Sequence, residues 1–340
     1  MKEMVTQFKQ ELARSESKGI ENEIRLYDEV EATLREGFTT LDLESVFTVI
    51  DGISQGKGLK DLGYLATFLF RKGSFDTPSE MTLEAAKRLR LRFEEFVRRV
   101  CWVKPARLAD VTRTWFPFLQ SVYNSTVPSY NNTYSTDGGR SGYSFGSNWI
   151  FFTTNYDNVI ERLWRDAVRR FPLNTGFQLD SPSNTHVMDT KQFWQSNLRL
   201  LKLHGSVTWW KEEDTGRIVE RDQPPDSSYI QPRFGERIMV YPIQQKDTFS
   251  RPYFDLFYAF NQALQKSKKW LVIGYSFADD IIRAMLARSS TPDTTLVLVH
   301  PDPTASEKMA REPGWSGRLN HLKMKFGVAE TNPAIAEALR

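Results

Sequence analysis

Three short polar segments follow apolar runs in the second half of the chain, and they hold the residues best suited to chemistry. The segments are residues 153–157, 203–205 and 274–277. The apolar runs before them have the length and composition of buried strands. Because the carboxyl ends of parallel strands form the ligand-binding edge of an open α/β sheet, these segments predict a single site.

His204 and Asn155 are the candidate catalytic residues in these segments. An imidazole titrates near neutral pH and suits general-base work, and Gly205 lets the chain turn sharply beside a ligand. The amide of Asn155 carries no titrating proton, but it can orient a water molecule or a sugar hydroxyl. Each residue also has an ordinary structural interpretation, as a strand-end histidine and a turn-forming asparagine. Only their combination indicates catalysis.

Two of the segments lead directly into helical patterns. Thr154 lies three residues before Asp157, and Ser276 lies three residues before Asp279. We interpret each pair as an acidic variant of the capping box that opens a helix. Exposed N–H groups and the helix dipole at such starts favour anionic groups such as phosphate.

Strands and helices must alternate from residue 149 onward to position these segments. Strands are predicted at 149–153, 198–204, 238–241, 270–275, 295–300 and 322–326. Helices are predicted at 158–170, 252–268, 279–288 and 303–311, and a hairpin at 207–221. The alternation predicts an α/β fold with a Rossmann-like, doubly wound parallel sheet, an N-terminal helical region and helical insertions.

The domain organisation follows from the same change in sequence pattern. Residues 1–123 are predicted to form a mainly helical region that packs on the Rossmann core at 149–340. Its helices are expected at 42–53, 59–70, 78–100 (approximately) and 105–123. Thr77 is the expected N-cap of the third, with Pro78 at its first position. An arginine cluster at residues 88–99 is interpreted as the solvated face of a helix. Residues 124–148, rich in Ser, Asn, Gly and Tyr, predict a flexible loop.

Composition excludes several classes of protein. A net charge of +3 without long runs of one sign gives no reason to expect direct nucleic-acid binding. Cys101 is the single cysteine, so an intrachain disulfide and a zinc site of paired thiolates are excluded, and no metal is expected. Apolar stretches are shorter than the ~20 residues that span a bilayer, and charges run through the first residues. These features predict a cytoplasmic protein without membrane contact.

The three segments together resemble a known family. Thr-Thr-Asn-Tyr-Asp, Leu-His-Gly-Ser and Gly-Tyr-Ser-Phe-Ala-Asp-Asp are similar to the sirtuin-like domain of bacterial anti-phage defence proteins. Residues 241–246 with the following helix, and His-Pro-Asp-Pro at 300–303, resemble the same group. The resemblance is strong from residue 149 to the C-terminus and weaker over residues 42–53.

The resemblance implies a site for NAD, which members of this group hydrolyse to nicotinamide and ADP-ribose and so deplete in the infected cell. By analogy, Asn155 positions the attacking water or the ribose, and His204 is the base. Asp157 is expected near the nicotinamide carboxamide, and Ser276 near the phosphates or the adenosine ribose. The candidate NAD-binding residues are Thr154, Asp157, Gly274, Ser276 and His300, the last standing where the family often has Asn.

Two departures from the family pattern keep other functions open. The family fold opens with a strand and a Gly-Ala-Gly loop under the NAD phosphates, and no such glycine run is found near the start of this sequence. The element either precedes Met1 or is lost, and its loss would make this form a structural assembly subunit without activity. The four-cysteine zinc module of sirtuin deacylases is also missing, which favours the zinc-free hydrolase branch. Deacylation or ADP-ribosyl transfer is therefore a third alternative.

The resemblance also implies partners. Members of the group include free-standing domains of this size that work beside a HerA-type ATPase translocase. A homo-oligomer, with such an ATPase as partner, is the corresponding expectation for this chain.

Overall fold

The computed structural model describes residues 2–15, 20–37, 43–55, 80–103, 105–126, 149–165, 173–191, 198–221, 234–239 and 251–339. The chain divides into two compact units. The first, called here the helical unit, comprises Met1–Trp102, Gln223–Gln231 and Ile238–Asp247. The second, called here the α/β unit, comprises Val103–Asp222, Pro232–Arg237 and Thr248–Arg340.

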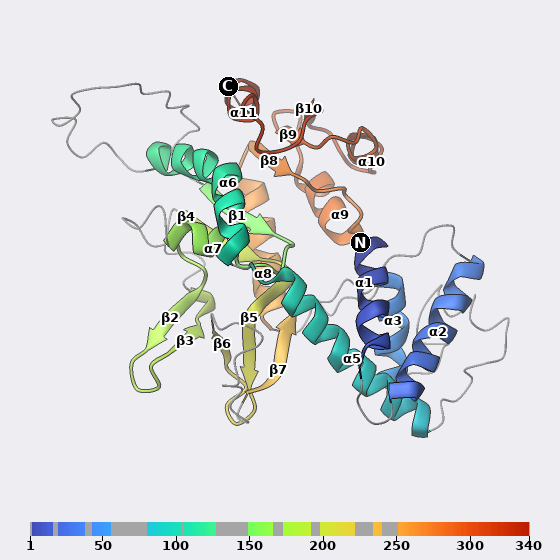
Figure 1. Ribbon diagram of the computed structural model, residues 1–340. Helices are drawn as coiled ribbons and strands as arrows, with labels where there is room; N and C mark the ends of the chain where they lie inside the picture. The colour runs from blue at the N-terminus through green and yellow to red at the C-terminus, as the bar shows by residue number, and fades with distance from the viewer. Residues whose placement is uncertain are drawn as a thin grey trace. The chain divides into compact units, whose positions relative to one another are not determined.

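The helical unit is built from amphipathic helices around an aromatic core. Its helices are α1 (Lys2–Ala13), α2 (Ile20–Gly37), α3 (Leu43–Ser54) and α5 (Glu80–Cys101) (Figure 1). The ring of Phe8 lies edge-to-face against Tyr27 and Phe93, with centroids 5.6 and 5.3 Å apart. The expected helix at 42–53 is thus confirmed as α3, while the expected helix at 59–70 and the cap at Thr77 lie outside the described residues.

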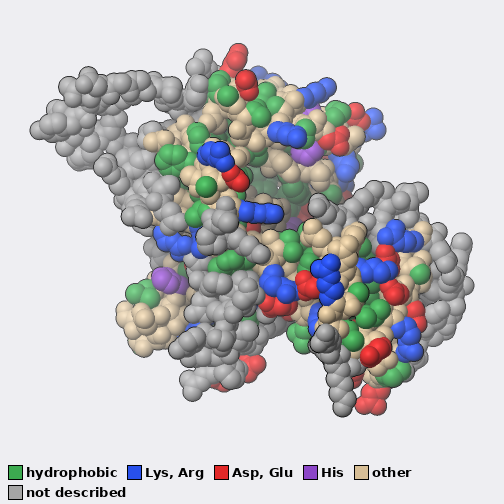
Figure 2. Space-filling model, in the orientation of Figure 1, with side chains coloured by type: hydrophobic (Ala, Val, Ile, Leu, Met, Phe, Trp, Pro, Cys, Tyr) green, Lys and Arg blue, Asp and Glu red, His purple; other side chains and the backbone are tan. Residues whose placement is uncertain are grey.

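The arginines of α5 are ion-paired, and their interpretation as a solvated face was wrong. Glu23 of α2 is fully buried and accepts hydrogen bonds from Arg88, at 2.9 Å, and from Arg92. Arg90 pairs with Asp51 of α3, and Arg99 with Glu11 of α1. The arginines face the other helices because a carboxylate buried between helices needs cationic partners. On the face of the helical unit seen in Figure 2, acidic and basic side chains are interspersed.

The α/β unit alternates strands and helices as predicted, except that the strand predicted at 238–241 starts earlier, at Phe234, and belongs to the five-stranded sheet; residues 240–241 lie outside the described residues. The parallel strands and the helices that alternate with them are β1 (Trp149–Thr153), α7 (Val159–Leu163), β4 (Leu198–Lys202), α8 (Tyr253–Lys266), β8 (Lys269–Ile273), α9 (Asp280–Ser289), β9 (Thr295–Val299), α10 (Thr304–Ala310) and β10 (Arg318–Leu322). The remaining elements are α6 (Pro105–Thr126), β2 (Phe177–Asp180), β3 (Thr185–Met188), β5 (Gly205–Glu212), β6 (Ile218–Glu220), β7 (Phe234–Met239) and α11 (Thr331–Ala338). The hairpin expected at 207–221 is confirmed by the antiparallel pair β5 and β6.

The strands of the described residues form three sheets (Figure 1). β1 pairs with β4 in parallel, and β8, β9 and β10 form a parallel sheet with β9 in the centre. The third sheet has the order β2-β3-β6-β5-β7, with antiparallel pairing from β2 through β5. The α/β class with parallel strands is therefore observed, whereas a single doubly wound sheet that joins the two parallel sheets stays a prediction.

Helices cover both faces of β1. Successive strand residues point to opposite faces, and Trp149 lies against Phe118 of α6 with ring centroids 6.1 Å apart. Phe152, on the other face, lies 4.8 Å from Phe260 of α8. Around β1, the layers therefore have the order helix, strand, helix that a Rossmann-like fold requires.

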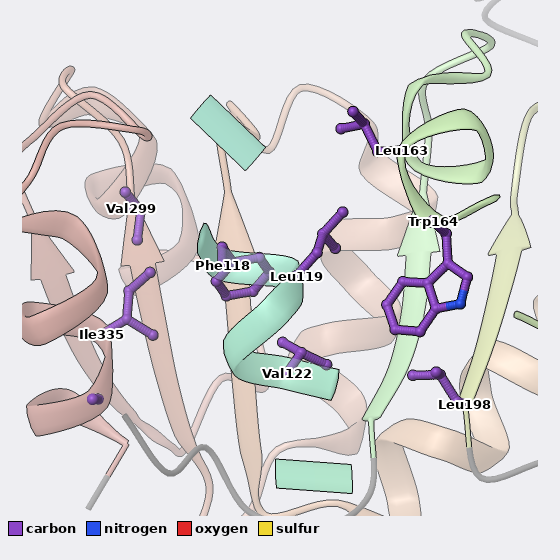
Figure 3. Close-up of a cluster of buried hydrophobic side chains, with 9 residues drawn as sticks. Phe118, Leu119, Val122, Leu163, Trp164, Leu198, Val299 and Ile335 are labelled. Atoms are coloured by element: carbon purple, nitrogen blue, oxygen red, sulfur yellow. The ribbon is translucent and has the colours of Figure 1, made fainter. Parts of the chain in front are cut away.

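One buried cluster links the two parallel sheets through α6. Figure 3 shows the α6 side chains Phe118, Leu119 and Val122 between two groups, Val299 and Ile335 on one side and Leu163, Trp164 and Leu198 on the other. Because Phe118, Leu119 and Val122 belong to this core, α6 groups with the α/β unit rather than with the helical region predicted for 1–123. α6 also continues to Thr126, so residues 124–126 of the predicted loop are helical, and 127–148 lie outside the described residues. The domain scheme otherwise stays a prediction.

The last strand was placed four residues too late. The pattern Leu-Lys-Met-Lys-Phe predicted a strand at 322–326, but β10 ends at Leu322, which pairs with the last residue of β9, Val299. Beyond Val299 the neighbouring strand stops before Pro301, so residues after 322 have no ladder to join. Met324 and Phe326 instead pack against the buried cluster.

Candidate active site

The loops after β1 and β4 lie together because these strands run in parallel and end at the same edge. Thr153 is in register with Lys202, the last residue of β4. The carbonyl oxygen of Tyr156 accepts hydrogen bonds from the Val207 backbone, at 3.0 Å, and from the Ser206 hydroxyl, at 3.3 Å. The structure therefore brings the Asn155 loop against the segment that carries His204.

His204 also contacts the loop that follows β8, through Asp279, for which the sequence pattern predicted a place at a helix start but no catalytic role. Its Nε2 lies 3.1 Å from Oδ2 of Asp279, and both side chains are 8% exposed. On its other side the imidazole lies beside Tyr156, with ring centroids 6.4 Å apart. The three loops expected to form one site are thus connected through Tyr156, His204 and Asp279.

Asp279 holds its carboxylate in a fixed orientation because it is the N-cap of α9. Its Oδ1 accepts hydrogen bonds from the backbone of Ile281 and Ile282, at 3.0 and 3.3 Å. The other oxygen, Oδ2, is left to face His204. The signal available in the sequence was an aspartate at a helix start, which indicates a cap but does not reveal a histidine 75 positions away.

The same contact assigns the tautomer of His204. An ionised carboxylate can only accept hydrogen bonds, so Nε2 must carry the proton that it donates to Asp279. Nδ1 then carries the lone pair in the neutral ring. A buried imidazole whose second nitrogen is held by a carboxylate has the arrangement of an oriented general base.

Glycines shape the loops on both sides of this pair. Gly205 has φ +80°, in the left-handed region, which allows β5 to start immediately after His204. Gly274, after β8, has φ +66°, and a Cβ atom built there would meet no atom within 4 Å. Phe277 also has a positive φ of 56° although it carries a side chain, which is buried. Arg283 secures this strained residue with a hydrogen bond to its carbonyl oxygen at 2.7 Å.

The helix starts are less open to anions than the sequence suggested. Oδ1 of Asp157 accepts a hydrogen bond from the Val159 backbone at 3.0 Å, and Asp279 occupies two N–H groups of α9 in the same way. Asn158, not Thr154, is the N-cap of α7. The two predicted capping boxes were therefore wrong. They required each aspartate to lie inside the first turn of its helix, but Asp157 and Asp279 lie just before α7 and α9 and accept hydrogen bonds from their first N–H groups.

The remaining predicted residues lie at the same strand ends. Asn155 is exposed, and its backbone N–H donates to the Thr153 hydroxyl at 3.0 Å. Gly274 donates its backbone N–H to Val299 at 2.9 Å, so Gly274 and His300 follow neighbouring strands. Ser276 is exposed. The half-buried His300 accepts a hydrogen bond at Nδ1 from the backbone of Asp302 in its own turn, at 3.1 Å. Their roles in ligand binding stay predictions.

The described residues contain neither a cluster suited to a metal ion nor a helix suited to span a membrane. Within this part of the chain, no group of three or more His, Cys, Asp and Glu side chains is arranged to hold a metal ion. None of the described helices combines the length and apolar character needed to cross a membrane.

Comparison with known proteins supports an assignment for the α/β unit. Residues 150–318 match the family model of the SIR2-like domain. No curated protein matches the chain. The matched range begins in β1, ends in β10 and contains the loops of Asn155, His204 and Asp279. The match of residues 150–318 to a SIR2-like domain supports a sirtuin-like family and is compatible with a function that uses NAD.

Proposed function

We propose that this protein is an NAD glycohydrolase, which cleaves NAD to nicotinamide and ADP-ribose. The observation that carries the proposal is the buried pair of His204 and Asp279 beside the Asn155 loop, inside a SIR2-like domain. A base held by a carboxylate at the carboxyl ends of parallel strands suits the activation of water next to a bound dinucleotide.

The reaction needs few groups from the protein. The bond between C1′ of the ribose and the nicotinamide nitrogen breaks, and nicotinamide leaves as a neutral molecule with the bonding electrons. A water oxygen forms the new bond to C1′ and loses its proton. We assign the orientation of the water or the ribose to the Asn155 amide and the removal of the proton to Nδ1 of His204. Asp279 stabilises the positive charge that develops on the imidazole ring.

We assign NAD contacts to Thr154, Asp157, Gly274, Ser276 and His300. The open space beside Gly274 supports this, since a dinucleotide can approach its backbone without meeting a side chain. The aspartate caps at α7 and α9 oppose a pyrophosphate directly at those two helix starts. We therefore place the pyrophosphate beside the exposed backbone of Gly274 and Ser276.

The biological role is proposed from the resemblance of the three polar segments alone. It is NAD depletion in anti-phage defence by the zinc-free branch of sirtuin-like hydrolases, in a homo-oligomer that works with a HerA-type ATPase. The aspartate caps that occupy the helix starts of α7 and α9 favour a second candidate, an assembly subunit that does no chemistry. Acyl-ADP-ribose or ADP-ribosylated protein among the products would instead indicate deacylase or transferase activity.

Release of nicotinamide from NAD tests the proposal. The full chain is incubated with NAD, alone and in the assembly purified from its native cells, and the products are separated by chromatography. We expect Asn155→Ala and His204→Ala to lower the rate by about 10²-fold or more. His186→Ala is the matched control, because His186 is an exposed histidine of β3, and it should leave the rate unchanged. Hydrolysis that persists in the Asn155 and His204 variants, or a wild-type protein that neither binds nor cleaves NAD, contradicts the proposal.

A further inference from the structure

Lys202 carries a buried ammonium group at the end of β4, the strand that leads to His204. It is the last residue of β4, two positions before His204, and it is 1% exposed. Lysine is almost never fully buried unless its charge is paired. The ammonium lies 2.9 Å from Oε1 of Glu161 and also donates a hydrogen bond to the carbonyl oxygen of Asp157.

These contacts join β4 to the loop that follows β1. Glu161 lies in α7, and Asp157 is the last residue of the Thr-Thr-Asn-Tyr-Asp segment. The hydrogen bonds of Asn155 N–H to Thr153 and of Val159 N–H to Asp157 are local and set only the shape of the loop. Contacts from the β4–β5 segment instead fix where the loop lies relative to His204. Lys202 supplies two of these contacts, at the end of the loop and at the following helix.

We propose that Lys202, paired with Glu161, is a positioning residue that holds the Asn155 loop in register with His204. This inference rests on the proposed function for its catalytic consequence. The ammonium compensates the charge of Glu161 and donates a hydrogen bond to the Asp157 carbonyl oxygen, so the loop has one preferred position. Without it, the contacts of Tyr156 with Ser206 and Val207 must hold this part of the loop, so the loop opens more often and can shift relative to the imidazole. A displacement of about 1 Å at a reacting group can cost roughly 10²-fold in rate.

A purely structural ion pair is the alternative, and a double variant separates the two. Lys202→Met leaves the Glu161 carboxylate unpaired and should destabilise the protein. Lys202→Met combined with Glu161→Leu removes both charges, so stability should return toward that of the wild type. The carbonyl of Asp157 still lacks its ammonium, so the positioning role predicts that kcat stays low. A structural role predicts that kcat recovers together with stability.

The kinetic test measures kcat and KM for NAD hydrolysis together with the Tm of each variant. We expect kcat to fall about 10- to 100-fold in Lys202→Met and in the double variant, with KM changed less than about threefold. Lys202→Arg keeps the charge and should restore kcat to within about tenfold of wild type. Arg217→Met is the control, because Arg217 forms its ion pairs with Asp180 and Glu212 in the antiparallel sheet, and it should leave kcat unchanged. Recovery of kcat in the double variant, or no rescue by Lys202→Arg in a folded protein, overturns the proposal.

Hydrogen exchange gives a readout that does not depend on activity. The amides of Asn155, Val159 and Val207 are protected by hydrogen bonds within or onto the loop. We expect these amides to exchange at least about tenfold faster in Lys202→Met and in the double variant, and at the wild-type rate in Arg217→Met. Unchanged exchange in both Lys202 variants overturns the positioning role. If the wild-type protein cleaves no NAD while exchange accelerates as expected, the proposed function fails and the positioning of the loop by Lys202 stands.

Discussion

Asp279→Asn is the most informative single change at the candidate site, because it separates the two tasks of this side chain. The amide oxygen of asparagine can still cap α9 by accepting from Ile281 and Ile282, and asparagine is as good an N-cap as aspartate. The amide nitrogen replaces the oxygen that faces His204, and it can only donate. His204 must then present Nε2 as an acceptor and carry its proton on Nδ1. The nitrogen that we assign as the base is thereby blocked.

The expected magnitudes follow from these contacts. Loss of a correctly oriented general base costs about 10²- to 10⁴-fold in kcat, and a wrong histidine tautomer in a Ser-His-Asp triad lies at the upper end of that range. Because the cap persists, Asp279→Asn should change the free energy of unfolding by less than about 1 kcal/mol. Asp279→Ala should lose the cap, at about 1 kcal/mol, and leave a buried imidazole N–H without its acceptor, at about 1–3 kcal/mol. Both variants should therefore lose most of their activity, but Asp279→Ala should be the less stable of the two.

The assay combines nicotinamide release with thermal unfolding of the same samples. The matched control is Asp280→Asn, since Asp280 is the neighbouring aspartate, is 83% exposed and pairs with Arg283. It should retain the wild-type rate and nearly the wild-type Tm. If Asp279→Asn keeps more than about half of the wild-type rate, Asp279 does not set the state of His204, and the assignment of Nδ1 as the base is refuted.

Two further predictions concern backbone strain and acid stability. Gly205→Ala places a side chain on a residue with φ +80°, so it should destabilise the fold by about 1–2 kcal/mol. Because Gly205 adjoins His204, this variant should also lower the hydrolysis rate. Gly216→Ala is the control, since Gly216 has φ +65° in the hairpin turn, and it should lower only the stability. For Glu31, burial raises the pKa, but hydrogen bonds from Lys9 and Arg35 outweigh burial and hold the pKa below its ordinary value of 4.5. A lowered folded-state pKa gives stability that is present above the unfolded value and is lost as pH falls through the folded value. Glu31→Gln should therefore be less stable than wild type at pH 7, and the difference should shrink below about pH 4 in denaturant titrations; a constant difference between pH 7 and pH 3 would contradict this account.

Local patterns were enough to predict most elements of the α/β unit. Apolar runs bounded by polar turn residues predicted β1, β8 and β9 to within two residues at each end. The 3.6-residue period likewise predicted α8 and α9. These features depend on neighbours along the chain, which is why a single sequence contains them. The placement of polar segments after three strands also predicted that the loops of Asn155, His204 and Gly274 lie at strand ends.

Features that depend on distant partners were predicted wrongly or not at all. The end of β10 is set by where β9 stops, and the arginines of α5 face carboxylates from three other helices. Neither partner is visible in the local pattern of β10 or α5. The same limit applies to α6, whose apolar face fits a helical domain equally well; only the buried cluster shows that it packs with residues of both parallel sheets.

The sequence by itself determined which chemical groups stand at the strand ends: an amide at Asn155, an imidazole at His204 and glycine-containing turns after β4 and β8. Only the tertiary structure decided that Asp279 holds the imidazole and that Lys202 lies under the Asn155 loop. Both contacts join residues more than 40 positions apart. The physical reason is that a side chain's partner depends on which strand ends adjoin in space, and periodicity along one segment carries no information about that arrangement.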